Sequence, residues 1–569
     1  MKHFLATLTF LFVGSLTLLA VPAYRGPIQM TQADGTTKTV YRHGDEHFNY
    51  ITDANGQWLK WQDGMLIRTE ALSEDEIVAK RESSPMRIAQ QRRVAQSDVN
   101  LAPHGLVILV NFTNKQFGTN NTREEFENMM NQPNYLYRGA RGSVKDYFRT
   151  QSFGLYDPTF DVIGPVTLDT TYQYYGKNSG GVSGQDMRPD RMIVDACRKA
   201  DKEFNIDFSQ YDNDGDGKVD FVFVFYAGRG EADSGDSDVI WPHMSYVYNS
   251  GYGTSCYLDG VLIDQYACSN ELPGTGSYHV GISTCCHEFS HVMGLPDMYN
   301  TSNPNDYETL GNWDIMDAGP YNNNGRTPPA YSGYERFFCG FAQPVILNSP
   351  CDVTLTEIQR SGQVLLITAT GYHNMVGNKP TPTTFYILEN RQKVKNDKYL
   401  PGHGLLITKI QYNQTAWFNN TVNSNASNHR IAIQTADGEI SLNSYTGMVG
   451  DGGDTYPGTA KVTSFSPIAE YPVTEITEQD SLIHFKFMGG GQELPLALSE
   501  TEQSEHQLLI ANSQLTIDRL TPNSQITVYN LTGQIVTNQT ATEQQINITL
   551  NPGIYIVRVN NKINKIIIH

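Results

Sequence analysis

Two histidines and a glutamate near the middle of the chain have the spacing of a metal-dependent hydrolase. They lie in the stretch Cys-His-Glu-Phe-Ser-His-Val-Met-Gly-Leu-Pro-Asp at 286–297. His287 and His291 are four residues apart, so on a helix both imidazoles project from one face, about one turn apart. This spacing lets two nitrogens share one zinc ion at about 2.0–2.1 Å. Glu288, beside the first histidine, can take a proton from the attacking water.

The third zinc ligand is expected just after this helix. Gly294 can leave the helix with a positive φ and turn the chain back toward the metal. Asp297 then supplies a carboxylate oxygen, which leaves the fourth position for water. Glu308 and Glu335 are the alternatives, at the longer separations used when a second helix donates a glutamate.

A methionine motif follows at 311–320, with the sequence Gly-Asn-Trp-Asp-Ile-Met-Asp-Ala-Gly-Pro. Together with the zinc-binding stretch it resembles the metzincin peptidases, although Asp297 departs from their commoner third histidine. The resemblance implies that Met316 forms an apolar floor beneath the metal without coordinating it, in a Met-turn. By itself a methionine is more often simply part of a core. Tyr321, just after this turn, is a candidate to stabilise the oxyanion.

Further motifs narrow the resemblance to the immune inhibitor A family of secreted bacterial metallopeptidases. They cover roughly residues 105–460 and lie at 287–299, 312–316, 331–336, 386–391 and 400–406. The resemblance implies endopeptidase activity, a catalytic zinc at His287, His291 and Asp297, and structural calcium. We interpret the motifs at 386–406 as a scaffold or cleft wall, or as ordinary β-core with a buried Glu–Arg pair.

An acidic run at 212–220 has the pattern of a calcium loop. Four aspartates occupy positions 1, 3, 5 and 9 of an EF-hand-type loop, namely Asp212, Asp214, Asp216 and Asp220. Gly217 takes the sixth position and Lys218 offers its backbone carbonyl, but Phe223 replaces the bidentate glutamate at the twelfth. A solvated acidic turn is the alternative, although these carboxylates repel one another without a cation. The turn at 451–454 is a weaker calcium candidate.

The two ends of the chain indicate export. Residues 1–23 have a basic start, an apolar run and a small-residue cleavage site, as in a signal peptide. No later stretch reaches ~18 apolar residues, so we expect no transmembrane anchor. Residues 508–569 resemble the type IX secretion sorting domain of Bacteroidetes, and a small Ig-like adhesion module is the alternative. The matching motifs lie at 528–533, 550–558 and 565–569.

The sorting resemblance implies passage through the periplasm and outer membrane of a Gram-negative bacterium. The expected partners are therefore the type IX secretion machinery and protein or peptide substrates, and we expect a monomer. Lysine and arginine number 41 against 60 acidic residues, a net charge of −19 that makes nucleic acid an improbable partner. Seven cysteines lie mid-chain; Cys256–Cys268 and Cys339–Cys351 are plausible disulfides by spacing, and no cysteine has a recognisable protease setting.

Buried-strand patterns at 105–112 and 221–227 and a helical one at 279–293 precede a turn-rich β pattern. We therefore expect an α+β multidomain chain whose metzincin-like catalytic domain combines a mixed twisted sheet with the active-site helix. The expected units are a signal peptide (1–23), a propeptide (24–100), the catalytic domain (101–345), a β-rich domain (346–490), a linker (491–507) and an Ig-like β-sandwich sorting domain (508–569).

Residues 24–100 resemble the propeptide of a zymogen. No cysteine precedes Cys197, so this segment cannot block the zinc with a thiolate. A carboxylate such as Asp45 or Glu46, or simple steric cover, must serve instead, with release expected near Arg93. The sequence thus predicts a secreted, zymogenic zinc endopeptidase; a catalytically silent adhesion protein on the same fold and a zinc amidase of non-protein substrates are the alternatives.

Overall fold

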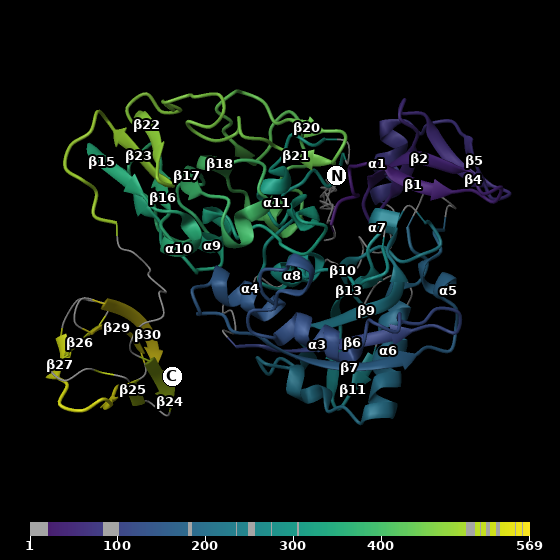
Figure 1. The fold of residues 1–569 in the computed structure, drawn as a ribbon, viewed down its shortest axis with the longest axis horizontal. Coiled ribbons are helices and arrows are strands. Elements are labelled where there is room, and N and C mark those ends of the chain that lie inside the picture. Colours follow the sequence, from purple (N-terminus) through teal and green to yellow (C-terminus); the bar gives the residue numbers. More distant parts are fainter. Residues whose placement is uncertain are drawn as a thin grey trace, which may run out of the picture. The chain divides into compact units, whose positions relative to one another are not determined.

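The structure, a computed structural model, describes residues 21–568 apart from internal gaps. The gaps are 83–101, 180–184, 235, 248–255, 275, 304–305, 497–506, 512–513, 519, 521–523, 531–534, 552 and 560–561. Most of the expected signal peptide, the expected release site near Arg93 and most of the expected linker therefore lie outside the described residues. The chain divides into two compact units, one up to residue 499 and one from residue 500 onward (Figure 1).

The N-terminal segment folds as a small antiparallel sheet followed by a helix. Its strands pair in sequence order around an apolar core that includes Val40 and Ile51. The elements are β1 (Ile28–Thr31), β2 (Thr37–Gly44), β3 (Asn49–Thr52), β4 (Trp58–Gln62), β5 (Met65–Arg68) and α1 (Glu74–Glu82). This sheet belongs to the first unit, and its β2–β3 loop reaches the candidate site described below.

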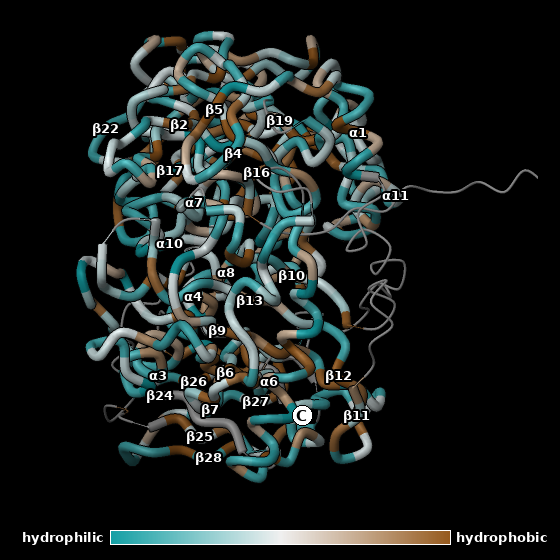
Figure 2. Tube along the Cα trace, turned by 90° about the vertical axis from the view of Figure 1, so that its right-hand side faces the viewer, coloured by the Kyte–Doolittle hydropathy of each residue, from teal (hydrophilic) through white to brown (hydrophobic). Residues whose placement is uncertain are grey.

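A five-stranded mixed sheet forms the centre of the expected catalytic domain. Four strands run parallel and the edge strand β10 runs antiparallel, in the order β10-β13-β9-β6-β7. The strands are β6 (His104–Asn111), β7 (Thr159–Thr167), β9 (Val222–Arg229), β10 (His243–Tyr246) and β13 (Gln265–Leu272). Strands β6 and β9 are continuous apolar runs because both faces of the sheet are covered. Figure 2 shows hydrophobic, brown trace close to β6.

Successive residues of the central strands enter two different cores. Val107 and Leu109 pack with the helices on one face, and Leu106 and Ile108 pack with α6 on the other. The first face carries α3 (Arg123–Asn131), α4 (Val144–Gln151) and α8 (Ser283–Val292); the second carries α6 (Pro189–Phe204). Smaller elements are η1 (Tyr137–Gly139), α5 (Tyr172–Gly176), η2 (Phe208–Tyr211), β8 (Lys218–Val219), α7 (Glu231–Ser234), β11 (Cys256–Leu258) and β12 (Val261–Ile263).

The β-rich segment packs directly onto the central part. One apolar cluster includes Phe126 and Trp313 as well as Ile387 and Trp417, so the core is continuous across the expected boundary at residue 345. One sheet contains β14 (Val345–Ile346), β16 (Leu365–Ile367), β17 (Thr384–Arg391), β18 (Gly404–Gln411) and β19 (Ile431–Ile433). The others contain β15 (Cys351–Leu355), β22 (Val473–Gln479) and β23 (Leu482–Phe487), and β20 (Leu442–Asn443) with β21 (Met448–Val449). The helices are η3 (Gly311–Trp313), η4 (Gly319–Tyr321), α9 (Gly333–Phe338), α10 (Ile358–Ser361), η5 (Lys395–Tyr399) and α11 (Gln414–Phe418).

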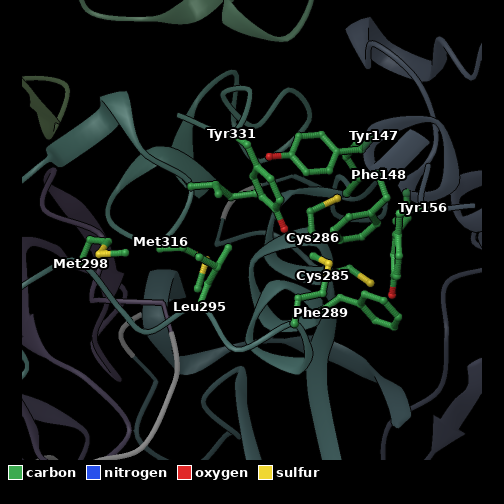
Figure 3. Close-up of a cluster of buried hydrophobic side chains, with 14 of the residues drawn as sticks. Tyr147, Phe148, Tyr156, Cys285, Cys286, Phe289, Leu295, Met298, Met316 and Tyr331 are labelled. Carbon is green, nitrogen blue, oxygen red and sulfur yellow. The ribbon is translucent and has the colours of Figure 1, made fainter. Parts of the chain in front are cut away.

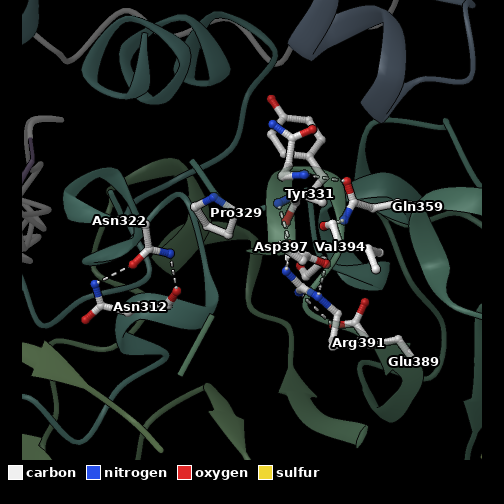
Figure 4. A network of polar contacts seen from close by, with 12 residues as sticks. Asn312, Asn322, Pro329, Tyr331, Gln359, Glu389, Arg391, Val394 and Asp397 are labelled. Atoms are coloured by element: carbon white, nitrogen blue, oxygen red, sulfur yellow. Dashed lines mark hydrogen bonds and ion pairs between the residues drawn. The ribbon is translucent and has the colours of Figure 1, made fainter. Parts of the chain in front are cut away.

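A buried ion-pair network accounts for the motif at 386–391. Arg391 binds Asp397 through two bonds, with Nη2–Oδ1 at 2.7 Å and Nε–Oδ2 at 2.9 Å (Figure 4). Glu389 lies 3.4 Å from the same guanidinium and accepts the backbone N–H of Gly333, while Asp397 accepts that of Ala330. The motif is thus a buried Glu–Arg pair that fixes the chain after the Met-turn, the second of the two readings given above.

The C-terminal unit is a β-sandwich. Its two sheets share an apolar core that joins Leu515 and Ile548 of one sheet to Val528 and Val557 of the other. The strands are β24 (Gln507–Ala511), β25 (Gln514–Asp518) and β28 (Ile546–Thr549), and β26 (Gln525–Asn530), β27 (Ile535–Thr540), β29 (Gly553–Val559) and β30 (Lys562–Ile568).

The two expected disulfides are not formed: all seven cysteines are free thiols. Cys256 begins β11 in the small side sheet, whereas Cys268 lies in β13 of the central sheet. Cys339 caps α9, and Cys351 packs in a different core from α9. The two cysteines of each expected pair therefore lie on separate elements, although they are close in sequence. Within the described part of the chain, no helix has the length and apolar character needed to cross a membrane.

Candidate active site

Helix α8 carries both histidines and is oriented by its apolar face. Cys286 and Phe289 are buried with the aromatic side chains of α4, and the Phe289 and Phe148 ring centroids are 5.2 Å apart (Figure 3). Cys285 and Phe289 pack in this core and fix the rotation of the helix about its axis. The two histidines therefore project from a different face of the helix. His287 and His291 are themselves completely buried.

Three side-chain atoms converge as a zinc ligand set requires. The Nε2 atoms of His287 and His291 are 3.2 Å apart. Oδ1 of Asp297 lies 3.2 Å from the first Nε2 and 3.6 Å from the second. Ligands bound at ~2.0–2.1 Å on a tetrahedral zinc are separated by about 3.3 Å, so these three atoms fit one ion.

Backbone carbonyls set the orientation of both imidazoles. Nδ1 of His287 bonds the carbonyl of Ile315 at 2.7 Å, and Nδ1 of His291 bonds that of Leu295 at 2.8 Å. A carbonyl only accepts, so each Nδ1 carries the proton and each Nε2 keeps its lone pair for a metal. Gly294, at φ 92°, ends the helix and brings both Leu295 and Asp297 back toward the histidines.

The methionine motif packs in the same apolar core as helix α8. Met316 is fully buried, its N–H donates to Asp314 and its carbonyl accepts the N–H of Met298. Figure 3 shows the side chains of Met316, Leu295 and Met298 grouped beside α8. The turn therefore shares the core of α8 and, through Ile315, orients His287.

Glu288 is a buried acid without a side-chain partner. It is completely buried, no side chain among the described residues hydrogen-bonds its carboxyl, and the backbone of Val21 in the N-terminal segment faces it. One of its oxygens lies within 4.8 Å of ligand atoms of both histidines. Burial, with the charges of Asp297 and Glu46, raises its pKa well above the ordinary value. Such a group can both accept and return a proton.

A residue that the sequence analysis did not single out holds the third ligand. Asn420 donates from Nδ2 to Oδ2 of Asp297 at 2.6 Å and accepts the Asp297 N–H at 2.6 Å. It follows α11 at φ 53°, 123 residues beyond Asp297 in sequence. The structure places neither alternative ligand with the histidine pair: Glu308 is exposed, and Glu335 caps α9 by accepting the N–H of Ser332.

The acidic loop at 212–220 brings three of its aspartates together. Ligand oxygens of Asp212, Asp214 and Asp216 lie within 4.8 Å of one another. Asp220 instead accepts two bonds from Asn213, at 2.6 and 2.9 Å. Lys218 begins β8 with its ammonium 3.5 Å from Asp216, so calcium would take only its backbone carbonyl.

The weaker calcium candidate at 451–454 is occupied by internal contacts. Asp454 accepts Trp313 Nε1 at 2.7 Å and the Asp451 N–H at 2.8 Å. Asp451 accepts the Ser441 hydroxyl and the Gly453 N–H. This turn therefore ties the β-rich segment to η3, immediately before the Met-turn.

Parts of the N-terminal segment cover the site. Val21 accepts Trp241 Nε1 at 3.2 Å, and the Tyr321 hydroxyl donates to Pro22 at 2.6 Å, so this hydroxyl is engaged by the N-terminal segment. Glu46, in the β2–β3 loop, is only 1% exposed and its charge raises the pKa of both Glu288 and Asp297. No donor hydrogen-bonds its carboxyl among the described residues, although His47 lies 3.1 Å away as an ion-pair partner.

Parts of the chain are similar to known metallopeptidases and to a secretion domain. Residues 102–341 match the family model of the immune inhibitor A peptidase M6 catalytic domain, and residues 511–569 match that of the secretion system C-terminal sorting domain. The pre-pro-metalloprotease PrtV of Vibrio cholerae is 26% identical over 226 residues, which are 36% of this chain and 24% of PrtV. Immune inhibitor A of Bacillus thuringiensis subsp. alesti is 26% identical over 243 residues, 38% of this chain and 35% of that protein. The matched region thus spans about a quarter to a third of these relatives.

Proposed function

We propose that this chain, which carries a peptidase M6 catalytic domain and a C-terminal sorting domain, is an exported zinc endopeptidase made as a zymogen. The observation that carries the proposal is the convergence of two imidazole nitrogens and one carboxylate oxygen within 3.6 Å of one another, beside the buried Glu288. His287, His291 and Asp297 would hold the zinc.

The chemistry follows from the positions of these groups. When bound, zinc supplies the Lewis acidity that polarises the scissile carbonyl and acidifies the attacking water. Glu288 accepts the proton that the water loses and then delivers it to the leaving amine. Burial raises the pKa of the Glu288 carboxyl, which suits a group that must take up and release one proton in each turnover. Tyr321 can stabilise the oxyanion once its hydroxyl is released from Pro22.

Latency is assigned to residues 24–100, with Glu46 as the blocking carboxylate. Glu46, Glu288 and Asp297 are three buried carboxylates, and the charge of Glu46 raises the pKa of the other two. Such a grouping is stabilised by a divalent cation shared among them. Asp45 is less suited because Arg81 already binds its carboxylate. Glu46 would thus take the position that the attacking water needs.

The sorting domain indicates secretion or surface export. Passage by the type IX route through the periplasm and outer membrane of a Gram-negative bacterium, proteins as substrates and a monomeric state are part of the proposal. Calcium at Asp212, Asp214 and Asp216 would have a structural role. Its loop holds the start of β6, because Asn213 accepts the N–H of His104 and donates to its carbonyl.

The experiment compares the processed wild-type protein with Glu288→Ala, each assayed for bound zinc and for casein cleavage. We expect one zinc in both proteins and a loss of cleavage of at least a thousandfold in the variant. Cleavage by Glu288→Ala would contradict the assignment. Zinc without any cleavage by the wild type would favour the amidase, and no zinc at all would favour a silent adhesion protein.

A further inference from the structure

We propose that Glu231 and Asp186 form a recess that binds a basic side chain of the substrate, arginine in preference to lysine. In the zymogen, Arg42 of the N-terminal segment occupies this recess. The inference rests on the proposed peptidase function and adds a substrate class to it.

Arg42 sits in the recess as a completely buried guanidinium. Its Nη1 lies 2.7 Å from Oε1 of Glu231, and neither side chain is exposed. Asn178 donates to the same glutamate oxygen at 2.7 Å. Asp186 is 1% exposed, receives the Trp241 N–H at 2.9 Å, and has its pKa raised by burial and by the charge of Glu231.

The recess keeps binding capacity for a cation. Oε2 of Glu231 has no hydrogen-bond partner among the described residues. Burial raises the pKa of Glu231 to about 7, and the charge of Arg42 opposes that rise. Removal of the N-terminal segment would take the guanidinium away from Glu231. A cationic side chain of the substrate can then re-form the same ion pair and keep the carboxyl ionised.

The recess lies within reach of a peptide bound at the zinc site. Arg42 is four residues before Glu46, which corresponds to at most about 13 Å of extended chain. Trp241 connects the recess to the N-terminal residues beside the site: its backbone N–H donates to Asp186 at 2.9 Å, and its indole N–H donates to the carbonyl of Val21 at 3.2 Å. An extended substrate with its scissile carbonyl beside Glu288 can therefore place a side chain in the recess from three or four residues away.

The backbone next to the recess already binds one backbone group of the N-terminal segment. The Tyr24 N–H donates to the carbonyl of Ala232, which follows Glu231 in sequence. Trp241 also precedes β10, the antiparallel edge strand of the central sheet. An edge strand offers unpaired backbone groups to an added peptide. The recess thus adjoins a surface suited to peptide backbone.

Arginine is favoured over lysine by the shape of the acceptor. Glu231 and Asp186 offer carboxylate oxygens to several N–H groups of one planar guanidinium, whereas an ammonium is a compact charge that cannot form the same fork. Arginine is also less strongly hydrated, so it enters a fully buried recess at lower cost.

The test uses the processed protein and quenched fluorescent peptides that differ only in arginine against citrulline, a neutral analogue of similar shape. The substitution is placed in turn at each position up to four residues from the scissile bond. At one position three or four residues away, we expect kcat/KM for the arginine peptide to be at least ten times that for the citrulline peptide, and the lysine peptide should give an intermediate value. In Glu231→Gln the ratio of arginine to citrulline kcat/KM should fall to below threefold. Glu203→Gln, at an exposed glutamate of α6, should keep the wild-type ratio.

A binding measurement separates this inference from the proposed function. Agmatine, a free guanidinium probe, should raise the Tm of the processed wild type and of Glu203→Gln, but not that of Glu231→Gln or Asp186→Asn. Equal kcat/KM for the arginine and citrulline peptides at every position would contradict the arginine-binding recess. If the same protein cleaves casein, the proposed peptidase function is unaffected by that result. If no peptide is cleaved, the absence of an agmatine shift in the wild type overturns the recess on its own.

Discussion

The carboxamide of Asn420 binds Asp297 at two points, donating to its Oδ2 and accepting its backbone N–H, each at 2.6 Å. The other carboxylate oxygen, Oδ1, is thereby directed at the two histidines. Partners of this kind fix a metal ligand's orientation and are part of the metal site. In the proposed zinc site, the third ligand is therefore held in place by the β-rich segment.

Asn420→Ala should weaken zinc binding by about 10–100-fold, because Asp297 loses both its backbone and its side-chain restraint. Competition of the processed protein with a chromogenic chelator measures the affinity directly. Asn425→Ala, at an exposed asparagine of the same segment, serves as the control and should bind zinc like the wild type. Equal affinities in all three proteins would show that the carboxamide plays no part in metal binding.

Glu46→Gln should release the zymogen from latency, because an amide is a poorer metal ligand than a carboxylate. With cobalt in place of zinc, we expect the visible absorption of the zymogen to shift in this variant. Casein cleavage by the unprocessed chain should rise at least tenfold. Glu70→Gln, at an exposed glutamate of the same segment, should change neither. An unchanged cobalt spectrum would leave steric cover as the mechanism of latency.

Calcium should stabilise the protein through the loop at 212–220. Adding calcium to calcium-free zymogen at constant zinc should raise the Tm, since a ligand at a hundredfold excess over its dissociation constant contributes about 2.7 kcal/mol. Asp214→Asn should remove the increase, and Asp169→Asn, whose side chain is 88% exposed, should retain it. A calcium response that survives Asp214→Asn would place the ion elsewhere.

Stability should fall as the pH rises toward 7 because of a buried acid pair, Asp314 within the Met-turn and Glu335 in α9. Burial and the charge of Asp317 raise the pKa of Asp314 to about 7, and burial and Asp314 raise that of Glu335 well above its ordinary value. At a pH between the ordinary carboxyl pKa and these raised values, the folded chain therefore keeps the two protons, whereas the unfolded chain has lost them. The free energy of unfolding thus decreases from the ordinary carboxyl range up to about pH 7.

Asp314→Asn keeps the acceptor for the Met316 N–H but removes one titrating group. Denaturant unfolding between pH 4.5 and 7.5 should therefore show a smaller loss of stability in this variant than in the wild type. Asp169→Asn should follow the wild type. Parallel pH profiles for all three proteins would mean that Asp314 does not retain its proton in the fold.

The sequence predicted best where the signal is local. The histidine spacing requires only a helix, and the structure forms it at α8; Gly294 needs only its own positive φ to turn the chain. The continuous apolar runs correctly indicated β6 and β9, since strands covered on both faces need no alternation. In the C-terminal unit, alternating strands likewise predicted the sandwich.

Contacts between distant segments could not be predicted in the same way. Asn420 reaches Asp297 across 123 residues, and nothing in its local sequence distinguishes it from neighbouring asparagines. Arg42 and Glu231 are 189 residues apart. The disulfide prediction failed for the same reason, because spacing says nothing about which sheets the cysteines enter. The role of a buried carboxylate such as Glu46 likewise depends on neighbours that are distant in sequence.

The most direct test of the account is the anomalous scattering of crystals of the zinc-loaded protein, recorded on both sides of the zinc absorption edge. We predict one strong peak within bonding distance of Nε2 of His287, Nε2 of His291 and Oδ1 of Asp297. A peak bound elsewhere, or no peak near α8 in protein that contains stoichiometric zinc, would contradict the assignment of this site as the catalytic centre.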